Sequence, residues 1–370
     1  MRLKALELWW RRLWIRLLVR LMRQPAGKGA PDWAARPHRV LFLRHDRAGD
    51  MILSTGVMRA IARSHSTITM DVLASPANAA ILEAADYVAD VIVFDKKKLA
   101  TYLPTALRLR RNRYDAVIDC MVTAPSLTTL LLVAASGARH RVGIAGRGND
   151  DAFSVTVPPE TRAGAHMVDL LAALAPAFAV NASAVEKQPV ISLTAEERQR
   201  AERSWGDGHR SRILINISAG TSARAWPPEN YVAVMEHLRA REPRAVFRVI
   251  SAPAEAEKGE LVAEGGGGVF VRTPGIRDAF ALVATAGFVF TPDTSIAHAA
   301  SAFHIPCVAM YLRGTSERWG LYGTRGLSVE HPNSTLDDLP VATMLRAVDQ
   351  VLDDRVEQPH LGDAALREPR

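Results

Sequence analysis

Short apolar runs alternate with amphipathic stretches along most of the chain. In the first half, the runs that are typical of buried strands are residues 39–43, 68–73, 91–94 and 116–119. Between them, a helical spacing of apolar positions is found in residues 51–64, 78–84, 99–110 and 127–135. Strands that alternate with helices predict a parallel, doubly wound sheet.

The alternation weakens after Gly146, where a single helix is predicted over 166–178, and it restarts near Arg212. The strands predicted in this second half are residues 212–216, 245–250, 269–271, 288–290 and 307–310, with a helix at 228–239. A polar stretch, 186–211, separates the halves and is expected to connect them. We therefore predict two Rossmann-like domains, 38–188 and 189–370, that face a central cleft.

Residues 1–25 have a different pattern. Arg12, Arg16, Arg20 and Arg23 share one helical face, and leucines and tryptophans occupy the other. A basic amphipathic helix with tryptophan is typical of an element lying on an anionic membrane surface. Charged residues interrupt its apolar runs, so it is predicted neither to span a bilayer nor to be a signal peptide. The alternative is a helix packed on its own protein. Residues 26–37, rich in Pro and Gly, are predicted to be a linker.

Charge and cysteine content limit which partners and metal sites are expected. The formal net charge of the 370 residues is +7, and residues 1–25 contribute +6, which leaves +1 for the rest. Without a basic stripe in the body of the chain, nucleic acid is not an expected partner. Cys120 and Cys307 lie in apolar runs without a CxxC partner, so we expect buried thiols and no bound metal.

Polar segments follow three of the predicted strands: residues 44–50, 216–226 and 291–298. Loops that leave a strand and open a helix are where α/β proteins bind ligands. The first of these loops lacks the GxGxxG fingerprint, which argues against a dinucleotide site. Polar loops in both halves predict a substrate held by two domains. Two such domains that face one cleft predict the GT-B glycosyltransferase architecture.

Over residues 39–345 the chain resembles glycosyltransferase family 9, the heptosyltransferases of the lipopolysaccharide inner core. The residues that carry the resemblance are Arg44-x-Asp46-x-x-Gly49-Asp50, Tyr114-Asp115-x-Val117-Ile118-Asp119, Gly137-Ala138-Arg139-x-Arg141-Val142-Gly143, Asn216 to Trp226-Pro227, and Asp293-Thr294-x-x-x-His298-x-Ala300. The resemblance implies an inverting transfer of heptose from ADP-heptose to a lipid-linked acceptor, the lipid A–core lipopolysaccharide. It implies neither a cofactor nor a metal. It also implies a cytoplasmic enzyme, peripheral on the inner face of the inner membrane.

Two residues are the candidate catalytic groups on this resemblance. Asp50 falls on the family's Gly-Asp carboxylate and is expected to be the general base, although an Asp at this place could instead cap the helix. Arg224 stands where the family usually has Lys and is expected to stabilise the departing diphosphate. Asp46 is expected to be a structural partner of Arg44.

The donor is expected to contact small polar residues, the start of one helix, two acidic residues and a histidine. The candidates are Ser218, Thr221, Ser222, Glu255, Asp293, Thr294, Ser295 and His298. Thr294 and Ser295 open a helix whose N–H groups could hold phosphate. Glu255 suits a ribose diol, with Glu257 as its rival. Asp293 would repel a diphosphate, so it is expected to contact a sugar hydroxyl or to fix its loop. His298 could face the donor or pack in the core.

The acceptor side offers fewer signals. Arg59, Arg139 and Arg141 are candidates for contacts with an anionic acceptor. Two other functions remain open at this stage. One is a family-9 enzyme that uses another nucleotide sugar, and the other is a non-catalytic, membrane-bound protein that binds a nucleotide sugar.

Overall fold

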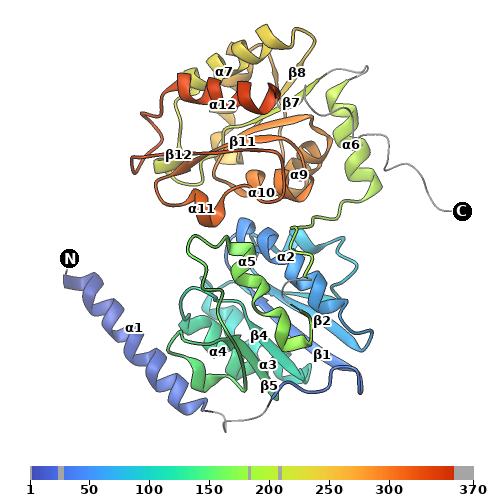
Figure 1. The fold of residues 1–370 in the computed structure, drawn as a ribbon, viewed down its shortest axis with the longest axis vertical. Coiled ribbons are helices and arrows are strands. Elements are labelled where there is room, and N and C mark those ends of the chain that lie inside the picture. Colours follow the sequence, from blue (N-terminus) through green and yellow to red (C-terminus); the bar gives the residue numbers. More distant parts are fainter. Residues whose placement is uncertain (1, 24–28, 182–184, 207–210, 354–370) are drawn as a thin grey trace, which may run out of the picture. The chain divides into compact units, whose positions relative to one another are not determined.

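The computed structural model describes residues 2–23, 29–181, 185–206 and 211–353. The chain divides into two compact units, Met1–Ser192 and Leu193–Arg370 (Figure 1). Part of the predicted linker, residues 26–28, lies outside the described residues, as do residues 354–370. Each unit is an α/β domain built on a six-stranded parallel sheet.

The first unit runs from α1 to η4. Its elements in chain order are α1 (Arg2–Leu21), β1 (His38–Arg44), α2 (Ala48–Ala62), β2 (Ile68–Ala74), η1 (Ala79–Leu82), β3 (Asp90–Val93), η2 (Leu99–Thr101), α3 (Tyr102–Arg111), β4 (Ala116–Asp119), α4 (Leu127–Ser136), β5 (His140–Ile144), η3 (Asp150–Ala152), β6 (Val155–Val157), α5 (Met167–Ala172) and η4 (Ala175–Phe178).

The second unit begins with a helix inside the stretch that was predicted to be a connection. Its elements are α6 (Ala195–Trp205), β7 (Arg212–Asn216), η5 (Ser222–Arg224), α7 (Pro228–Arg241), β8 (Val246–Ile250), η6 (Pro253–Glu255), α8 (Ala256–Gly265), β9 (Val269–Phe270), α9 (Ile276–Thr285), β10 (Phe288–Pro292), α10 (Ser295–Ala302), β11 (Cys307–Leu312), α11 (Ser316–Trp319), β12 (Gly326–His331) and α12 (Val341–Asp353).

The two sheets share one topology. The first has the order β3-β2-β1-β4-β5-β6, and the second, taken from its other edge, has the order β9-β8-β7-β10-β11-β12. In each sheet the chain builds outward from the first strand, then returns and builds in the opposite direction. The strand order therefore reverses between β1 and β4 in one unit and between β7 and β10 in the other.

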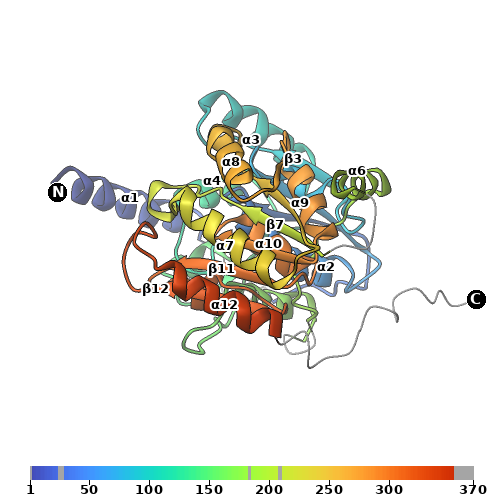
Figure 2. The same cartoon turned by 90° about the horizontal axis from the view of Figure 1, so that it is seen from above.

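The central strands are buried, as their apolar sequences require. Val40, Leu41, Phe42 and Leu43 of β1 have no exposed surface, because helices cover both faces of a parallel sheet. In the second unit Phe290 of β10 packs against Trp226 and Tyr231, and Phe288 belongs to the same core. Figure 2 shows the helices of the second unit on both sides of its sheet.

Local capping explains where several helices begin and end. The Oγ atom of Ser126 accepts a hydrogen bond from the amide of Thr129 at the start of α4, and Gly137 ends α4 with φ of 60°. Thr194 and Glu197 form a capping box at the start of α6. This signal lies in the polar stretch 186–211, where the helix was missed because charge outweighs its apolar face.

The helix predicted over 166–178 is interrupted. It forms α5 and η4, because Pro176 has no amide hydrogen to continue the helical pattern. The helix predicted over 78–84 is a short 3₁₀ turn, η1. No described helix is both long and apolar enough to cross a membrane.

Candidate active site

The polar loops predicted from the sequence lie where the strand order reverses in each sheet. Arg44 is the last residue of β1, and residues 45–50 follow it. Cys120 follows β4, Arg224 follows β7 and Asp293 follows β10. The carboxyl ends of parallel strands at such a reversal are where open α/β sheets bind ligands. Each unit therefore has one candidate ligand-binding edge, which we describe separately.

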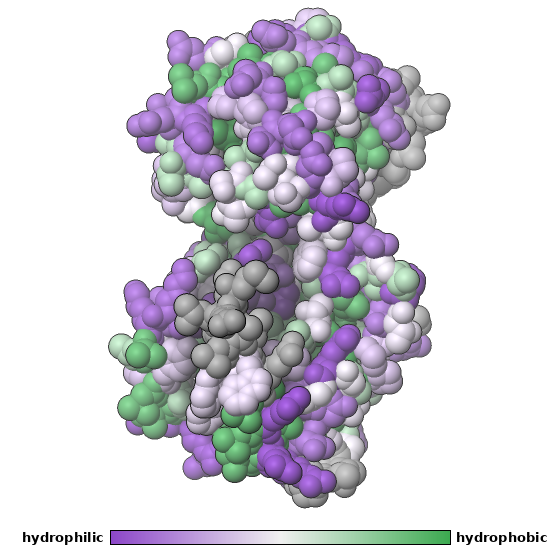
Figure 3. Space-filling view, turned by 90° about the vertical axis from the view of Figure 1, so that its left-hand side faces the viewer, coloured by the Kyte–Doolittle hydropathy of each residue, from purple (hydrophilic) through white to green (hydrophobic). Residues whose placement is uncertain are grey.

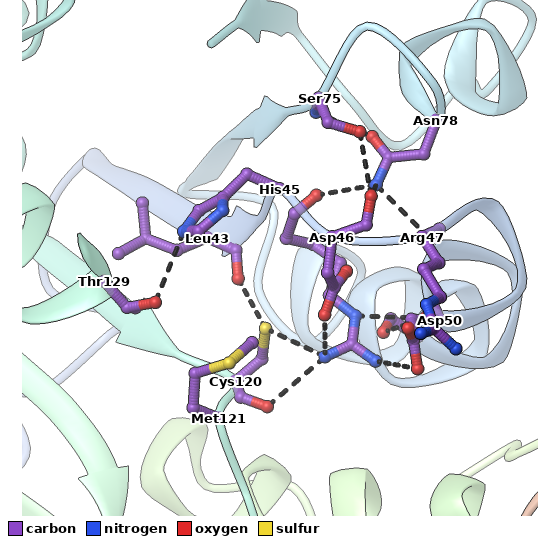
Figure 4. Close-up of polar contacts among 12 residues, drawn as sticks. Leu43, His45, Asp46, Arg47, Asp50, Ser75, Asn78, Cys120, Met121 and Thr129 are labelled. Carbon is purple, nitrogen blue, oxygen red and sulfur yellow. Dashed lines mark hydrogen bonds and ion pairs between the residues drawn. The ribbon is translucent and has the colours of Figure 1, made fainter. Parts of the chain in front are cut away.

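Arg44 organises the edge of the first unit. Its side chain is 3% exposed, and its guanidinium lies between two carboxylates: Nη1 is 3.3 Å from Asp46 Oδ2 and Nη2 is 3.4 Å from Asp50 Oδ1 (Figure 4). Nε also donates to the backbone carbonyl of Asp50 at 3.0 Å. Cys120 completes the surroundings, because its Sγ atom accepts from Nη1 at 3.4 Å. The expected pairing of Asp46 with Arg44 is confirmed.

Asp50 lies in the first turn of α2 without capping it. The N-cap residue is Arg47, and no side chain makes a capping hydrogen bond there. The Asp50 carboxylate contacts Arg44 instead and keeps 22% of its side-chain surface exposed. The alternative role of Asp50 as a helix cap is therefore not what the structure shows. A carboxylate held beside a fixed cation, yet open to solvent on one side, has the placement that a general base needs.

Asn78 fixes the loop that carries these carboxylates. It is fully buried, and its Nδ2 atom donates to the carbonyls of Arg44 at 3.0 Å and Asp46 at 3.4 Å. Ser75 Oγ donates to the Asp46 carbonyl at 2.9 Å. Sequence reasoning missed both residues, since they follow β2, about 30 positions from the loop that they hold.

Burial perturbs the titratable groups around Arg44. It raises the pKa of the Asp119 carboxyl to about 6, and it raises the pKa of the Cys120 thiol to about 12. Burial also lowers the pKa of His45 to about 4, with smaller contributions from the charges of Lys96 and Arg44. At neutral pH Cys120 is therefore a thiol, as expected of a buried cysteine, and His45 is neutral.

A basic run lies at the same sheet edge. Lys96, Lys97 and Lys98 follow β3 and are exposed, and the charge of Lys96 reaches His45 and Asp46. Sequence reasoning missed this run, although three consecutive lysines directly after a predicted strand were a usable signal. Through Lys96 the run adds positive charge beside the loop that carries Asp46.

The three arginines predicted to contact the acceptor lie away from Asp50, and their contact with an acceptor stays a prediction. Arg59 is in the last turn of α2, nine residues beyond Asp50, and pairs with Glu186 at 2.8 Å. Nine helical residues span roughly 13 Å. Arg139 and Arg141 are at the amino end of β5, opposite the ligand-binding edge, and Arg141 Nη1 donates to the Met22 carbonyl.

Arg224 and Asp293 form the centre of the edge of the second unit. Arg224 Nη2 is 2.9 Å from Asp293 Oδ2, and Nη1 donates to the Asp293 carbonyl at 3.2 Å. Asp293 is buried, whereas 23% of the Arg224 side chain is exposed. Asp293 therefore fixes the direction of Arg224, which accounts for a carboxylate beside a predicted phosphate site.

Asn216 connects this pair to the start of α10. Its buried Nδ2 atom donates to Thr291 Oγ1 at 2.8 Å and to Thr294 Oγ1 at 3.1 Å. Thr294 is the N-cap of α10, and its Oγ1 accepts from the Ile296 amide at 3.3 Å. Ser295 is the first helical residue. The N–H groups at this helix start lie at the ligand-binding edge, as the sequence predicted.

Two further donor candidates are tied to the loop after β7. Ser218 Oγ donates to Asn216 Oδ1 at 2.8 Å and accepts from the Ala252 amide at 2.7 Å. Glu255 Oε2 accepts from the Ala219 amide at 3.4 Å, whereas its rival Glu257 is exposed on α8. This position favours Glu255 over Glu257 for contact with a ligand at this edge.

The remaining donor candidates differ in exposure. Thr221 and Ser222 are exposed in the loop, and Ser222 lines a cavity of about 410 Å³ with Trp226 and Lys258. His298 is buried on α10, a position that favours packing in the core. Among the described residues, no three His, Cys, Asp or Glu side chains are grouped as a metal site would require.

The family model described as glycosyltransferase family 9 (heptosyltransferase) matches residues 105–340, more than half of the chain. The chain belongs to this family. It is therefore a glycosyltransferase. No protein of curated function matches its sequence.

Solved structures agree with this membership at the level of the fold. A family 9 glycosyltransferase from Veillonella parvula is 15% identical, with a TM-score of 0.75, and the match covers 87% of this chain and 99% of that one. ADP-heptose lipopolysaccharide heptosyltransferase II of E. coli is 18% identical, with a TM-score of 0.67 and coverage of 86% and 99%. The E. coli heptosyltransferase WaaC with ADP is 17% identical, with a TM-score of 0.67 and coverage of 85% and 99%. The predicted GT-B fold class, with two Rossmann-like domains, is confirmed.

Proposed function

We propose that this glycosyltransferase transfers heptose from ADP-heptose, with inversion, to a lipid-linked acceptor of the lipopolysaccharide inner core. The description of its family supports the sugar. Solved structures with the same fold are described as holding ADP and ADP-2-deoxy-2-fluoro heptose. The observation that carries the proposal is chemical: the ligand edge of one unit has an open carboxylate, Asp50, and that of the other has an open cation, Arg224.

In this proposal the acceptor is bound by residues 38–188 and the donor by residues 189–370. Asp50 takes the proton from an acceptor hydroxyl. The oxygen then forms a bond to the anomeric carbon of the donor, and the bond between that carbon and the diphosphate oxygen breaks. ADP leaves with the electron pair of the broken bond. Attack from the face opposite the leaving group inverts the anomeric centre.

The donor side supplies positive charge to the leaving group. Arg224, held by Asp293, faces the growing negative charge of the diphosphate. The amides at the start of α10, near Thr294 and Ser295, add further N–H donors. Glu255 accepts hydrogen bonds from the ribose hydroxyls, and Ser218, Thr221 and Ser222 provide side-chain hydroxyls. His298 is buried, which favours packing in the core over contact with the donor.

On the acceptor side, the lysines after β3 replace the three arginines predicted from the sequence. A lipopolysaccharide inner core is anionic, and Lys96, Lys97 and Lys98 are exposed at the same sheet edge as Asp50. Because the acceptor is attached to a lipid, the enzyme works in the cytoplasm at the inner face of the inner membrane. No metal or cofactor takes part in this proposal.

A panel of nucleotide sugars tests the donor. Purified protein is heated with ADP-heptose, other ADP-sugars, UDP-sugars or GDP-sugars, and the apparent midpoint of unfolding is measured. A ligand that binds the folded state raises that midpoint by mass action. We expect ADP-heptose to protect, and radiolabelled heptose to appear on a heptose-deficient lipopolysaccharide acceptor. Protection by UDP-sugars alone would overturn the ADP-heptose assignment and favour another nucleotide sugar. Protection without transfer would favour a binding protein.

A further inference from the structure

Helix α1 exposes a row of large apolar side chains. Its members are Trp9, Trp10, Leu13, Trp14, Leu17 and Leu21, each between 42% and 76% exposed. We call this set the outer row of α1. Exposed large apolar residues that occur singly are normal, but a continuous row on one helix marks a surface that contacts something apolar.

The outer row is not the face by which α1 packs on the protein. A different face of α1 already does so: Val19 and Met22 are buried in the core of the first unit, with Ile15 and Leu18 packed beside them. Arg141 Nη1 also donates to the Met22 carbonyl at 3.0 Å. The C-terminal half of α1 is thus fixed on α4 and η3, while its N-terminal half extends away from the unit (Figures 1 and 2).

Arginines form one border of the outer row. With about 100° of rotation per helical residue, Arg16, Arg20 and Arg23 fall between the buried face and the outer row. All three are exposed. The side chain of Arg12, which the sequence places on the same stripe, lies outside the described residues. The helix therefore has three faces: one buried, one basic and one apolar. The two alternatives raised by its sequence are thus not exclusive.

Helices α3 and α4 also carry exposed leucines. Leu103 and Leu107 are one turn apart on α3 and are exposed, as is Leu131 on α4. Helix α4 packs against both α1 and α3. The lysines 96–98 lie just before α3 in the chain. Figure 3 views the molecule from the side of α1, where apolar and polar surface alternate on the first unit.

We infer that the outer row of α1 docks on an anionic lipid bilayer, with its tryptophans and leucines in the headgroup region and Arg16, Arg20 and Arg23 on lipid phosphates. Tryptophan favours this region because its ring is apolar and its N–H is polar. A second copy of the chain fits the row less well. A symmetric dimer through α1 would bring equivalent arginine stripes close together, and these like charges would repel each other.

Fixing α1 on the first unit gives the docking a direction. A helix joined to the body by a free linker would concentrate the enzyme at the bilayer without orienting it. Here Val19 and Met22 tie the helix to the unit that carries Asp50, so lipid contact also sets how that unit faces the bilayer. The inference does not rest on the proposed donor or acceptor, because binding to lipid is measured without either.

The test uses the full chain, two double variants and one single control variant. The first is Trp14→Gln with Leu17→Gln, which removes two exposed side chains of the outer row. The second is Arg16→Gln with Arg20→Gln. The matched control is Leu261→Gln, an exposed leucine on α8 of the second unit. Each protein is floated with vesicles of phosphatidylethanolamine and phosphatidylglycerol, and with vesicles of phosphatidylcholine alone.

We expect the unchanged chain and Leu261→Gln to float with the anionic vesicles. The outer-row variant should bind the anionic vesicles at least roughly tenfold more weakly than the unchanged chain, because it loses apolar area that the lipid would bury. The arginine variant should lose a similar factor at low salt and little at high salt. Binding of the outer-row variant at the level of the unchanged chain overturns the inference. A second result would also overturn it. In that case light scattering finds the unchanged chain dimeric and the outer-row variant monomeric, while both bind vesicles equally.

Discussion

Arg44 is a cation with almost no access to water, so the groups around it determine how the first unit handles charge. Asp46 and Asp50 both face its guanidinium, and Cys120 contacts it from the end of another strand. A buried cation of this kind must keep its partners, since removing one leaves an uncompensated charge. The residue-scale predictions separate the chemistry of Asp50 from this structural role.

Asp50→Asn should lower turnover by roughly a hundredfold or more, because an amide cannot accept the acceptor proton. Affinity for the donor should stay nearly unchanged. The measurement is the steady-state rate of heptosyl transfer together with ADP binding by calorimetry. Asp46→Asn is the matched control, since it makes the same change on the other carboxylate that contacts Arg44. Equal losses in both variants would mean that the charge around Arg44, and not a base, had been lost.

Arg224→Ala should weaken ADP binding and slow transfer, because charge grows on the departing diphosphate. Arg224→Lys should restore much of both, since Lys keeps the positive charge and is the usual residue of the family. Binding is measured by calorimetry and transfer by product formation. An Ala variant that binds ADP as tightly as the unchanged chain would contradict the role.

Asp119→Asn should change how stability depends on pH. Burial raises the folded-state pKa of Asp119 to about 6, above its ordinary value of 3.8. The folded state therefore binds a proton more readily than the unfolded state, and this contribution to stability is lost as pH rises through about 6. An amide has no charge to bury. In chemical unfolding, the free energy of unfolding of the variant relative to that of the unchanged chain should rise by on the order of 2 kcal/mol between pH 4 and pH 8. A pH-independent difference would contradict the burial argument.

At the scale of elements, the pattern of apolar runs predicted the central strands and most of the helices that flank the ligand edges. Strand β6 was missed because three residues carry too little pattern, and α6 was missed because its sequence is mostly charged. The loops predicted after strands placed Asp50 and Arg224 at the ends of their sheets, as the structure does, whereas their roles stay predictions. Contacts between distant segments were not predictable, such as Asn78 holding the Arg44 loop. The positions of the arginine candidates away from Asp50 were not predictable either, because the sequence shows a charge but not the end of the sheet at which it lies.

Helix α10 gives an element-scale prediction. Thr294→Ala removes the N-cap hydrogen bond to Ile296 and the contact with Asn216. It should cost about 1 kcal/mol of stability and also weaken ADP binding, because the first helical N–H groups become less ordered. Thr294→Ser keeps the hydroxyl and should behave like the unchanged chain. Unfolding in denaturant measures the first effect, and calorimetry with ADP measures the second. Intact ADP affinity in the Ala variant would exclude this helix start as a phosphate site.

At the scale of the whole molecule, the two units have separate cores, so damage to one should leave the other stable. Val19→Ala with Met22→Ala opens cavities where α1 packs on the first unit. A buried Met→Ala change alone typically costs roughly 2–5 kcal/mol. Amide hydrogen exchange should speed up in residues 29–181 and stay unchanged in residues 211–353. Faster exchange throughout both units would show that they unfold as one.

The two sheets also differ from many others in how little free edge they offer. Three of the four edge strands are short: β3 has four residues, β6 has three and β9 has two. The fourth, β12, has six residues, is contacted by α11, and carries Glu330. Short or charged edges discourage strand-to-strand aggregation. Precipitation of this protein in concentrated solution should therefore begin at its exposed apolar helix surface, where mild detergent can prevent it, and not at its β-sheets.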